Sequence, residues 1–244
     1  MIKNQYFVQK NICNLIRISS FKSSFNNQLL DEMQNNGLCV GWVKRYFLNP
    51  ESLRNIWELM STIDFEGKDN KSAIDLIRNY SISNGSKIFQ MHDNPIEEIC
   101  SSIIFAWNNM DNSAYPKINI NYTPNFGLAY DSTLHTWSPI KKMVNCCLDE
   151  SNDNNAAKII DYIKSFQQSK IAKKVNEYIC FIDTMIHHMC IHFKDNRIYL
   201  VETEEFGIGE VSSLYEVSNA LNKELYCSNS SEPQTMDIIF YKKN

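Results

Sequence analysis

One cysteine stands where a nucleophile would be placed. Cys39 lies in the stretch QNNGLCVGWVKRYF, ahead of Val40, Val43 and Phe47, which recur at helical spacing. A helix beginning near Gly37 would put the sulfur in its first turn, where backbone N–H groups and the helix dipole stabilise a thiolate and lower a cysteine pKa. The alternative interpretation is a cysteine buried in the core, since buried cysteine is common and the Gly-x-Cys-x-Gly pattern is short.

A nucleophilic cysteine needs a base and a group that orients the base. The segment IHHMCIHFKDNRIYLVETEEFGIGEV offers the pair His187 and His188 on an expected strand, followed by acidic residues on the next strand. The turn KDNR would join these two strands as a hairpin and bring their side chains together. Neighbouring strand residues face opposite sides, so only one of the two histidines can meet the cysteine.

The same strand has an alternative use as a metal site. On a regular strand His188, Cys190 and His192 share one face, and His187 lies on the other. Histidine and cysteine are zinc ligands, but no convincing fourth ligand accompanies these three, and the sequence has no Cys-x-x-Cys pair. We therefore expect no metal and no cofactor.

The elements that must position these residues change in type along the chain. The first half reads as helical: Asn49 and Pro50 form an N-cap and first helical residue, and apolar residues recur at helical spacing on both sides of them. Residues 1–34 form an N-terminal segment of uncertain structure. A helix follows in residues 154–178, and the later segments are rich in Ile, Val, Tyr and Phe, which favours strands. The sequence predicts an α+β fold with an antiparallel sheet in its C-terminal half.

Composition and charge exclude several classes of partner. The chain has 244 residues, 43% of them hydrophobic, and a net charge of −4 with its basic residues scattered along the sequence. We expect no nucleic-acid partner, no anionic membrane partner and no integral membrane segment. The first residues also lack the apolar run of a secretory signal peptide. The eight cysteines lie mostly in apolar or helical contexts, so we expect them to be reduced.

Three of these local patterns together resemble one protein family. GLCVGWVKRYF resembles the nucleophile helix of YopT-type bacterial effector cysteine proteases, which are papain-like enzymes. HHMCI resembles the base strand of that family, and YLVETEEFGIGEV resembles the strand that follows. The likeness covers roughly residues 35–47 and 182–241. It implies that residues 35–244 form one papain-like cysteine protease domain, with the nucleophile helix packed on the C-terminal antiparallel sheet.

The resemblance also implies roles for single residues. Cys39 takes the nucleophile position, His187 the base position and Glu202 the position of the orienting acid, where the family has Asp. His188 stays an alternative base, and Glu204 and Glu205 stay alternative acids. The oxyanion hole would combine the Cys39 N–H with an upstream amide, for which three residues are equal candidates: Gln34, Asn35 and Asn36.

The function implied by the family is hydrolysis of a host protein by a thiol protease. A virulence protein of this kind is secreted by a specialised bacterial system into the host cytosol, and its partner is the host substrate. The same three groups would serve a deamidase or a transglutaminase, which also pass through an acyl-enzyme. A non-catalytic interaction module that retains the fold is the alternative from another class.

Overall fold

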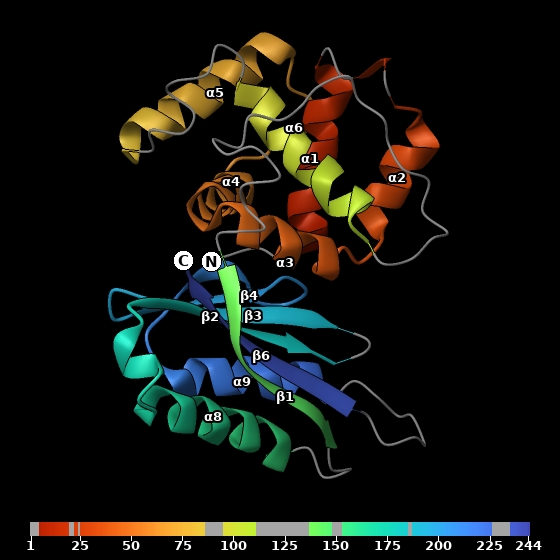
Figure 1. Cartoon of the computed structure of the whole chain (residues 1–244). Helices are drawn as coiled ribbons and strands as arrows, with labels where there is room; N and C mark the ends of the chain where they lie inside the picture. The colour runs from red at the N-terminus through yellow and green to blue at the C-terminus, as the bar shows by residue number, and fades with distance from the viewer. Residues whose placement is uncertain are drawn as a thin grey trace. The chain divides into compact units, whose positions relative to one another are not determined.

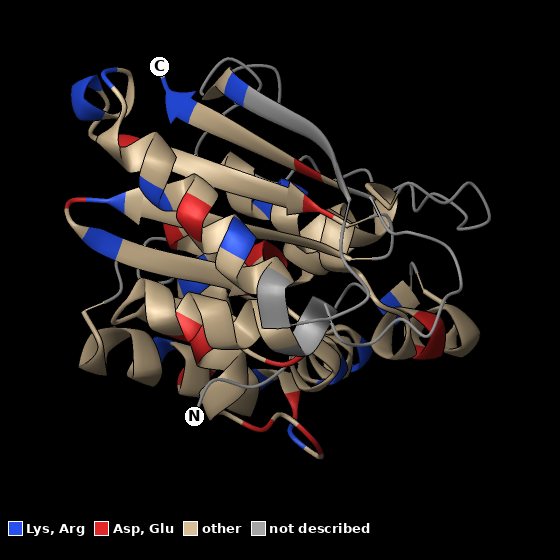
Figure 2. Ribbon diagram, turned by 90° about the horizontal axis from the view of Figure 1, so that it is seen from below, with Lys and Arg blue, Asp and Glu red and all other residues tan. Residues whose placement is uncertain are grey.

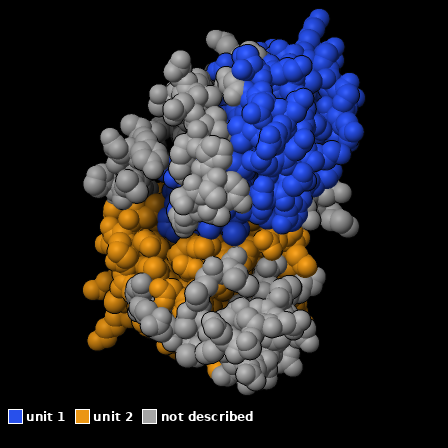
Figure 3. Space-filling model, turned by 90° about the vertical axis from the view of Figure 1, so that its right-hand side faces the viewer, with its two compact units in different colours: residues 1–130 blue, residues 131–244 orange. Residues whose placement is uncertain are grey.

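The structure, a computed structural model, divides into two compact units, residues 1–130 (unit 1) and 131–244 (unit 2), coloured separately in Figure 3. It describes residues 5–19, 22–23, 25–85, 95–110, 137–147, 153–184, 187–225 and 235–244. Among these residues unit 1 is helical, and unit 2 holds the sheet (Figure 1). The predicted α+β class, with helices first and an antiparallel sheet after them, is confirmed.

The part of unit 1 that the structure describes consists mainly of packed helices. Its described helices are α1 (Gln5–Ile18), α2 (Asn27–Asn35), α3 (Cys39–Leu48), α4 (Pro50–Thr62), α5 (Asn70–Ser83) and α6 (Pro95–Asn108). The predicted start of α4 is confirmed: Asn49 Oδ1 accepts a hydrogen bond from the Ser52 N–H, and Pro50 follows as the first helical residue. Asn26 and Asp69 cap α2 and α5 in the same way, through the N–H groups of Leu29 and Ser72.

Helix α1 supplies much of the apolar interior of unit 1. Ile12, Leu15 and Ile16, which share one face of this helix, are fully buried. Asn11 on the same helix donates to the carbonyls of Met60 and Ile63 at the end of α4 and accepts from the Phe65 N–H. The first 34 residues thus include two helices, α1 and α2, that belong to compact unit 1.

Unit 2 is built on one antiparallel sheet. The described strands are β1 (Trp137–Cys147), β2 (Glu177–Asp183), β3 (His188–Lys194), β4 (Arg197–Glu202), β5 (Gly207–Val211) and β6 (Thr235–Lys243). They form a six-stranded sheet in the order β1-β6-β2-β3-β4-β5. Helices α8 (Asp153–Gln168) and α9 (Leu214–Leu225) cover one face of it (Figure 1), and the short helix η2 (Ala172–Lys174) follows α8.

The core of unit 2 lies between this sheet face and the two helices. Alternation along β3 and β4 places Met189, Ile191 and Leu200 in that core, with Ile163 from α8 and Leu221 from α9. All five are at most 2% exposed. Burying side chains of this size stabilises a fold by about 1.5–3 kcal/mol each. The core therefore fixes the register of β3, which His187 directly precedes, and of β4, which ends at Glu202.

Several details differ from the sequence prediction. The helix expected over residues 154–178 ends at Gln168, the last residue of α8, and Glu177 and Tyr178 belong to β2. The segment from Ile179 to Phe193, whose composition favours one strand, forms parts of β2 and β3, and the Thr184 N–H donates to the His187 carbonyl between them. The strands β1 and β5 were not predicted. Residues 117–121, where apolar and polar residues alternate as in a strand, lie outside the described residues.

The predicted turn between β3 and β4 is confirmed. Asp195 and Asn196 have positive φ angles of 50° and 60°, as a two-residue hairpin turn requires. Over the described residues, no helix has both the length and the apolar character to cross a bilayer.

Candidate active site

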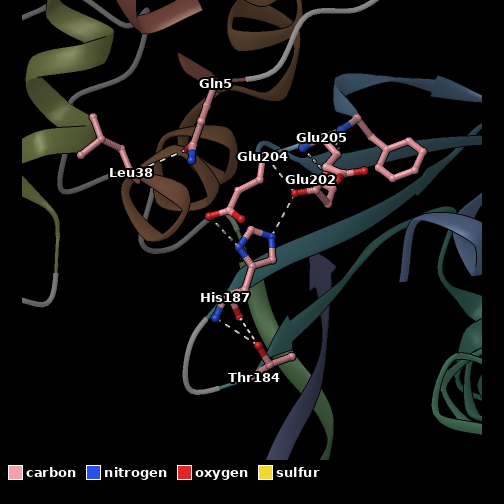
Figure 4. A network of polar contacts seen from close by, with 8 residues as sticks. Gln5, Leu38, Thr184, His187, Glu202, Glu204 and Glu205 are labelled. Atoms are coloured by element: carbon pink, nitrogen blue, oxygen red, sulfur yellow. Dashed lines mark hydrogen bonds and ion pairs between the residues drawn. The ribbon is translucent and has the colours of Figure 1, made fainter. Parts of the chain in front are cut away.

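Cys39 is the first residue of helix α3. The helix begins two residues later than Gly37, yet the sulfur still lies in the first turn, as predicted. Leu38 is the N-cap residue and provides no side-chain cap; its own N–H donates to Oε1 of Gln5 at 3.3 Å, drawn in Figure 4. First-turn N–H groups have no acceptor within their own helix, which suits this position to a thiolate.

A buried glutamine on α1 holds the start of α3 in place. Gln9 Nε2 donates to the carbonyl oxygens of Met33 at 2.8 Å and Asn36 at 3.0 Å, and its Oε1 accepts from Nε1 of Trp42 at 3.0 Å. Gln9 and Trp42 are fully buried. The connection between α2 and α3 is therefore fixed by a side chain far away in the sequence.

Gly41 has a packing role in the structure. A Cβ atom at this position would lie 1.9 Å from the carbonyl oxygen of Ala106 on α6. The absent side chain lets the backbones of α3 and α6 approach closely. What approaches Gly41 is therefore a helix of the same unit.

In unit 2, His187 and Glu202 form a buried pair. Nε2 of His187 lies 3.0 Å from Oε1 of Glu202, and the two side chains are 5% and 0% exposed (Figure 4). His187 directly precedes β3, and Glu202 ends β4. The β3–β4 hairpin therefore brings together the two residues predicted as base and orienting acid.

The turn after β4 holds the Glu202 carboxylate. Its Oε1 accepts from the N–H of Glu204 at 2.8 Å, and Oε2 accepts from the N–H groups of Glu205 at 3.0 Å and Phe206 at 2.9 Å. Burial acts to raise the pKa of Glu202, but the hydrogen bonds from His187 and from the N–H groups of Phe206 and Glu204 outweigh it, and the pKa lies below its ordinary value of 4.5. Glu202 is thus an ionised, fixed acceptor at neutral pH.

Thr184 holds the backbone of His187. Its hydroxyl donates to the His187 carbonyl at 2.9 Å and accepts the His187 N–H at 3.0 Å, and the Thr184 N–H donates to the same carbonyl at 3.0 Å (Figure 4). Thr184 is 3% exposed. Sequence analysis did not identify this residue, because it lies inside a run of strand-forming residues.

The alternative acids have different surroundings. Glu204 is 37% exposed, and its Oε1 lies 3.6 Å from Nδ1 of His187, on the opposite side of the ring from Glu202. Glu205 is exposed, and its backbone N–H is the group that contacts Glu202. Only Glu202 combines burial with a hydrogen bond to the imidazole.

The residues considered as metal ligands each have other contacts. Nε2 of His188 lies 3.2 Å from Asp183, and Nε2 of His192 lies 3.1 Å from Glu177. Cys190 is fully buried, and this burial raises the pKa of its thiol well above the ordinary value. The two rings thus face different carboxylates at opposite ends of β3.

The candidate oxyanion amides lie at the end of α2. Nδ2 of Asn35 donates to the Asp31 carbonyl at 2.8 Å, and Nδ2 of Asn36 donates to the Glu32 carbonyl at 2.7 Å, so both amides bond to their own helix. Gln34 is half-buried. Gln5, whose Oε1 accepts from the Leu38 N–H, is a further side chain at the start of α3, and sequence analysis missed it because a separation of 33 residues gives no local signal.

Comparisons with known proteins add little to this geometry. No family model matches the chain, and no curated protein matches it. Among solved structures the chain is similar to the Pseudomonas avirulence protein AvrPphB, with a TM-score of 0.36 and 9% sequence identity, covering 86% of this chain and 94% of that one. A likeness at this level assigns neither an activity nor site residues.

Proposed function

We propose that the chain is a papain-like thiol protease of bacterial effector type, with its protease domain in residues 35–244. Cys39 is the nucleophile, His187 the base and Glu202 the orienting acid. The observation that carries the proposal is the buried hydrogen bond between Nε2 of His187 and Glu202. A carboxylate fixed by three backbone amides and aimed at one ring nitrogen is the arrangement that orients a catalytic histidine.

The protonation of Glu202 sets the chemistry of the ring. An ionised carboxylate only accepts hydrogen bonds, so Nε2 of His187 carries a proton, and Nδ1 of the neutral ring carries the lone pair. In the proposed triad Nδ1 takes the proton of the Cys39 thiol. The base would then be His187 rather than His188, whose Nε2 faces Asp183 at the end of β2.

The reaction proposed is acyl transfer to sulfur. The Cys39 thiolate attacks an amide carbon, the Cys39 N–H and a side-chain amide stabilise the oxyanion, and protonated His187 gives its proton to the leaving amine. Water, deprotonated by the same histidine, then hydrolyses the thioester and restores the enzyme. Each step moves one proton through Nδ1, and Glu202 stays ionised throughout.

Gln5 joins Gln34, Asn35 and Asn36 as a candidate oxyanion donor. Its Oε1 accepts from the Leu38 N–H, which places its amide group beside the residue that precedes the nucleophile. Gln5→Ala should slow substrate turnover by roughly 10² to 10³. Alkylation of Cys39 forms no oxyanion and should keep its rate, so an equal loss in both assays would exclude Gln5 from this role.

The substrate proposed is a host protein, reached after secretion into the host cytosol. The test is incubation of the full chain with a mixture of folded eukaryotic proteins, followed by mass spectrometry, with Cys39→Ser as the matched control. We expect new N-termini that depend on Cys39. A Cys39-dependent gain of about one mass unit at Gln or Asn would indicate a deamidase instead, and addition of an amine a transglutaminase. No Cys39-dependent product would favour a non-catalytic module.

A further inference from the structure

Basic residues from three separate segments of unit 2 meet at one end of the sheet. The antiparallel register pairs Glu177 with Lys194, Tyr178 with Lys242, and Lys194 with Arg197, so the start of β2 and the ends of β3 and β6 lie together. The connection from α8 to β2 adds three lysines. We call this set the basic face: Lys170, Lys173, Lys174, Lys194, Arg197, Lys242 and Lys243. Figure 2 shows blue segments gathered at this end, near the C-terminus.

Most of this positive charge is not neutralised by neighbouring carboxylates. Lys243 lies 3.2 Å from Glu177, and Arg197 lies 3.7 Å from Glu210 across an exposed pair. The other five basic side chains form no ion pair with any residue that the structure describes. In a chain whose net charge is −4, the basic face is a local excess of positive charge.

Two open hollows lie on the basic face. One, of about 600 Å³, is lined by Lys170, Lys174, Lys242 and Lys243 with one glutamate. The other, of about 580 Å³, is lined by Lys173, Lys194 and Arg197 with one aspartate. The two hollows share Val175 and Asn176. Several anionic groups side by side would suit this surface better than one small anion.

One exposed aliphatic residue lies among these lysines. Ile171, between Lys170 and Ala172, is 48% exposed, and its side chain lines the first hollow. Lysines that flank an exposed aliphatic side chain are typical of surfaces at a membrane interface: the ammonium groups reach lipid phosphates, and the apolar residue reaches the acyl boundary.

We propose that the basic face binds the surface of a membrane containing anionic phospholipids, with Ile171 at the acyl boundary. This replaces the expectation of no anionic membrane partner, which rested on basic residues being scattered along the sequence, because strand register brings them together. Single-stranded nucleic acid fits less well, because it favours exposed aromatic rings for stacking, and the rings that line the second hollow, Tyr178 and Phe193, are each 7% exposed. His187 is at the opposite end of β3, roughly 20 Å away at about 3.3 Å per residue. Membrane binding would therefore leave the His187–Glu202 pair clear of the lipid.

The test is co-sedimentation of the full chain with vesicles. Vesicles of phosphatidylcholine with one third phosphatidylserine should bind the chain, phosphatidylcholine alone should not, and salt should weaken binding. The double variant Lys170→Glu/Lys174→Glu should weaken binding by roughly 30-fold or more, since each lysine near an anionic surface contributes about fivefold. Lys68→Glu/Lys71→Glu, with the same charge change at exposed sites in unit 1, is the matched control and should bind normally.

Two further variants separate this proposal from its rivals. Ile171→Ser should weaken vesicle binding several-fold without changing retention on an immobilised polyanion. Cys39→Ala should bind vesicles like the unaltered chain. The membrane proposal is therefore tested independently of the protease proposal. Equal binding to both vesicle types, or an Ile171→Ser variant that binds vesicles normally, would overturn the proposal. So would tight binding of single-stranded DNA by a chain that fails to bind vesicles.

Discussion

Nε2 of His187 and Oε1 of Glu202 lie 3.0 Å apart at the end of the β3–β4 hairpin, and both side chains are buried. Three consecutive backbone amides of the following turn bind the same carboxylate. This degree of fixation is unnecessary for a surface ion pair, which contributes little to stability. It suits a carboxylate whose task is to hold one tautomer and one orientation of a histidine.

Replacing Glu202 by Gln should greatly reduce turnover. The side-chain amide would offer N–H groups where the turn already presents three donors, and it no longer enforces a proton on Nε2 of His187. We expect a fall in kcat on the order of 10³-fold or more, the scale seen when an orienting acid becomes an amide. Glu205→Gln, at an exposed neighbour, is the control and should stay within a few-fold of the unaltered enzyme.

Unit 2 should lose stability in acid partly through Glu202. Its pKa in the folded state lies below 4.5, so its contribution is complete above pH 4.5 and is lost as pH falls through the folded-state pKa. Hydrogen exchange of the β4 amides between pH 6 and pH 3, corrected for intrinsic rates, should show the Glu202→Gln variant losing less stability than the unaltered chain. Equal losses would show that Glu202 is not the group responsible.

Thr184 should act as a positioning residue for His187. Thr184→Val keeps the shape but removes the hydroxyl that binds both the N–H and the carbonyl of His187. We expect kcat to fall roughly 10- to 100-fold with little change in KM, as for a small misplacement of a catalytic group. Thr184→Ser restores the hydroxyl and should restore most of kcat. If Thr184→Ser were as slow as Thr184→Val, Thr184 would have a packing role only.

Gly41→Ala should destabilise unit 1. Alanine favours helix over glycine by about 1 kcal/mol, but its Cβ would lie 1.9 Å from the Ala106 carbonyl oxygen and force α3 and α6 apart. Overpacking of this kind costs about 3 kcal/mol or more, so the clash exceeds the gain in helix propensity. Thermal unfolding followed by tryptophan fluorescence should show a lower Tm, whereas Lys44→Ala, exposed on the same helix, should unfold near the normal temperature.

Features with a local signal were predictable from the sequence. Asn49 and Pro50 predict the start of α4, and the pair Asp195 and Asn196 predicts the hairpin turn between β3 and β4. The choice of Glu202 over its neighbours came from the resemblance alone. Neither composition nor residue spacing distinguishes Glu202 from Glu204. The burial of Glu202 and its hydrogen bonds from three backbone amides form only when the turn folds.

Other features have no local signal. The connection at Thr184 lies in an apolar, β-branched run without glycine or proline, so the sequence favoured one continuous strand there. Gln5 reaches the start of α3 from 33 residues upstream. The basic face is assembled by strand register from residues scattered between Lys170 and Lys243, so charge patterning along the chain did not show it.

The rate at which Cys39 is alkylated at neutral pH tests the proposed triad most directly. Cys13, Cys100, Cys180 and Cys190 are fully buried, and Cys39→Ser measures the background from all the remaining thiols. We expect His187→Ala to slow alkylation of Cys39 by roughly 10² to 10⁴, the usual contribution of a positioned base, and His188→Ala to change it only a few-fold. Normal alkylation in His187→Ala, together with its loss in His188→Ala, would contradict the assignment of the base.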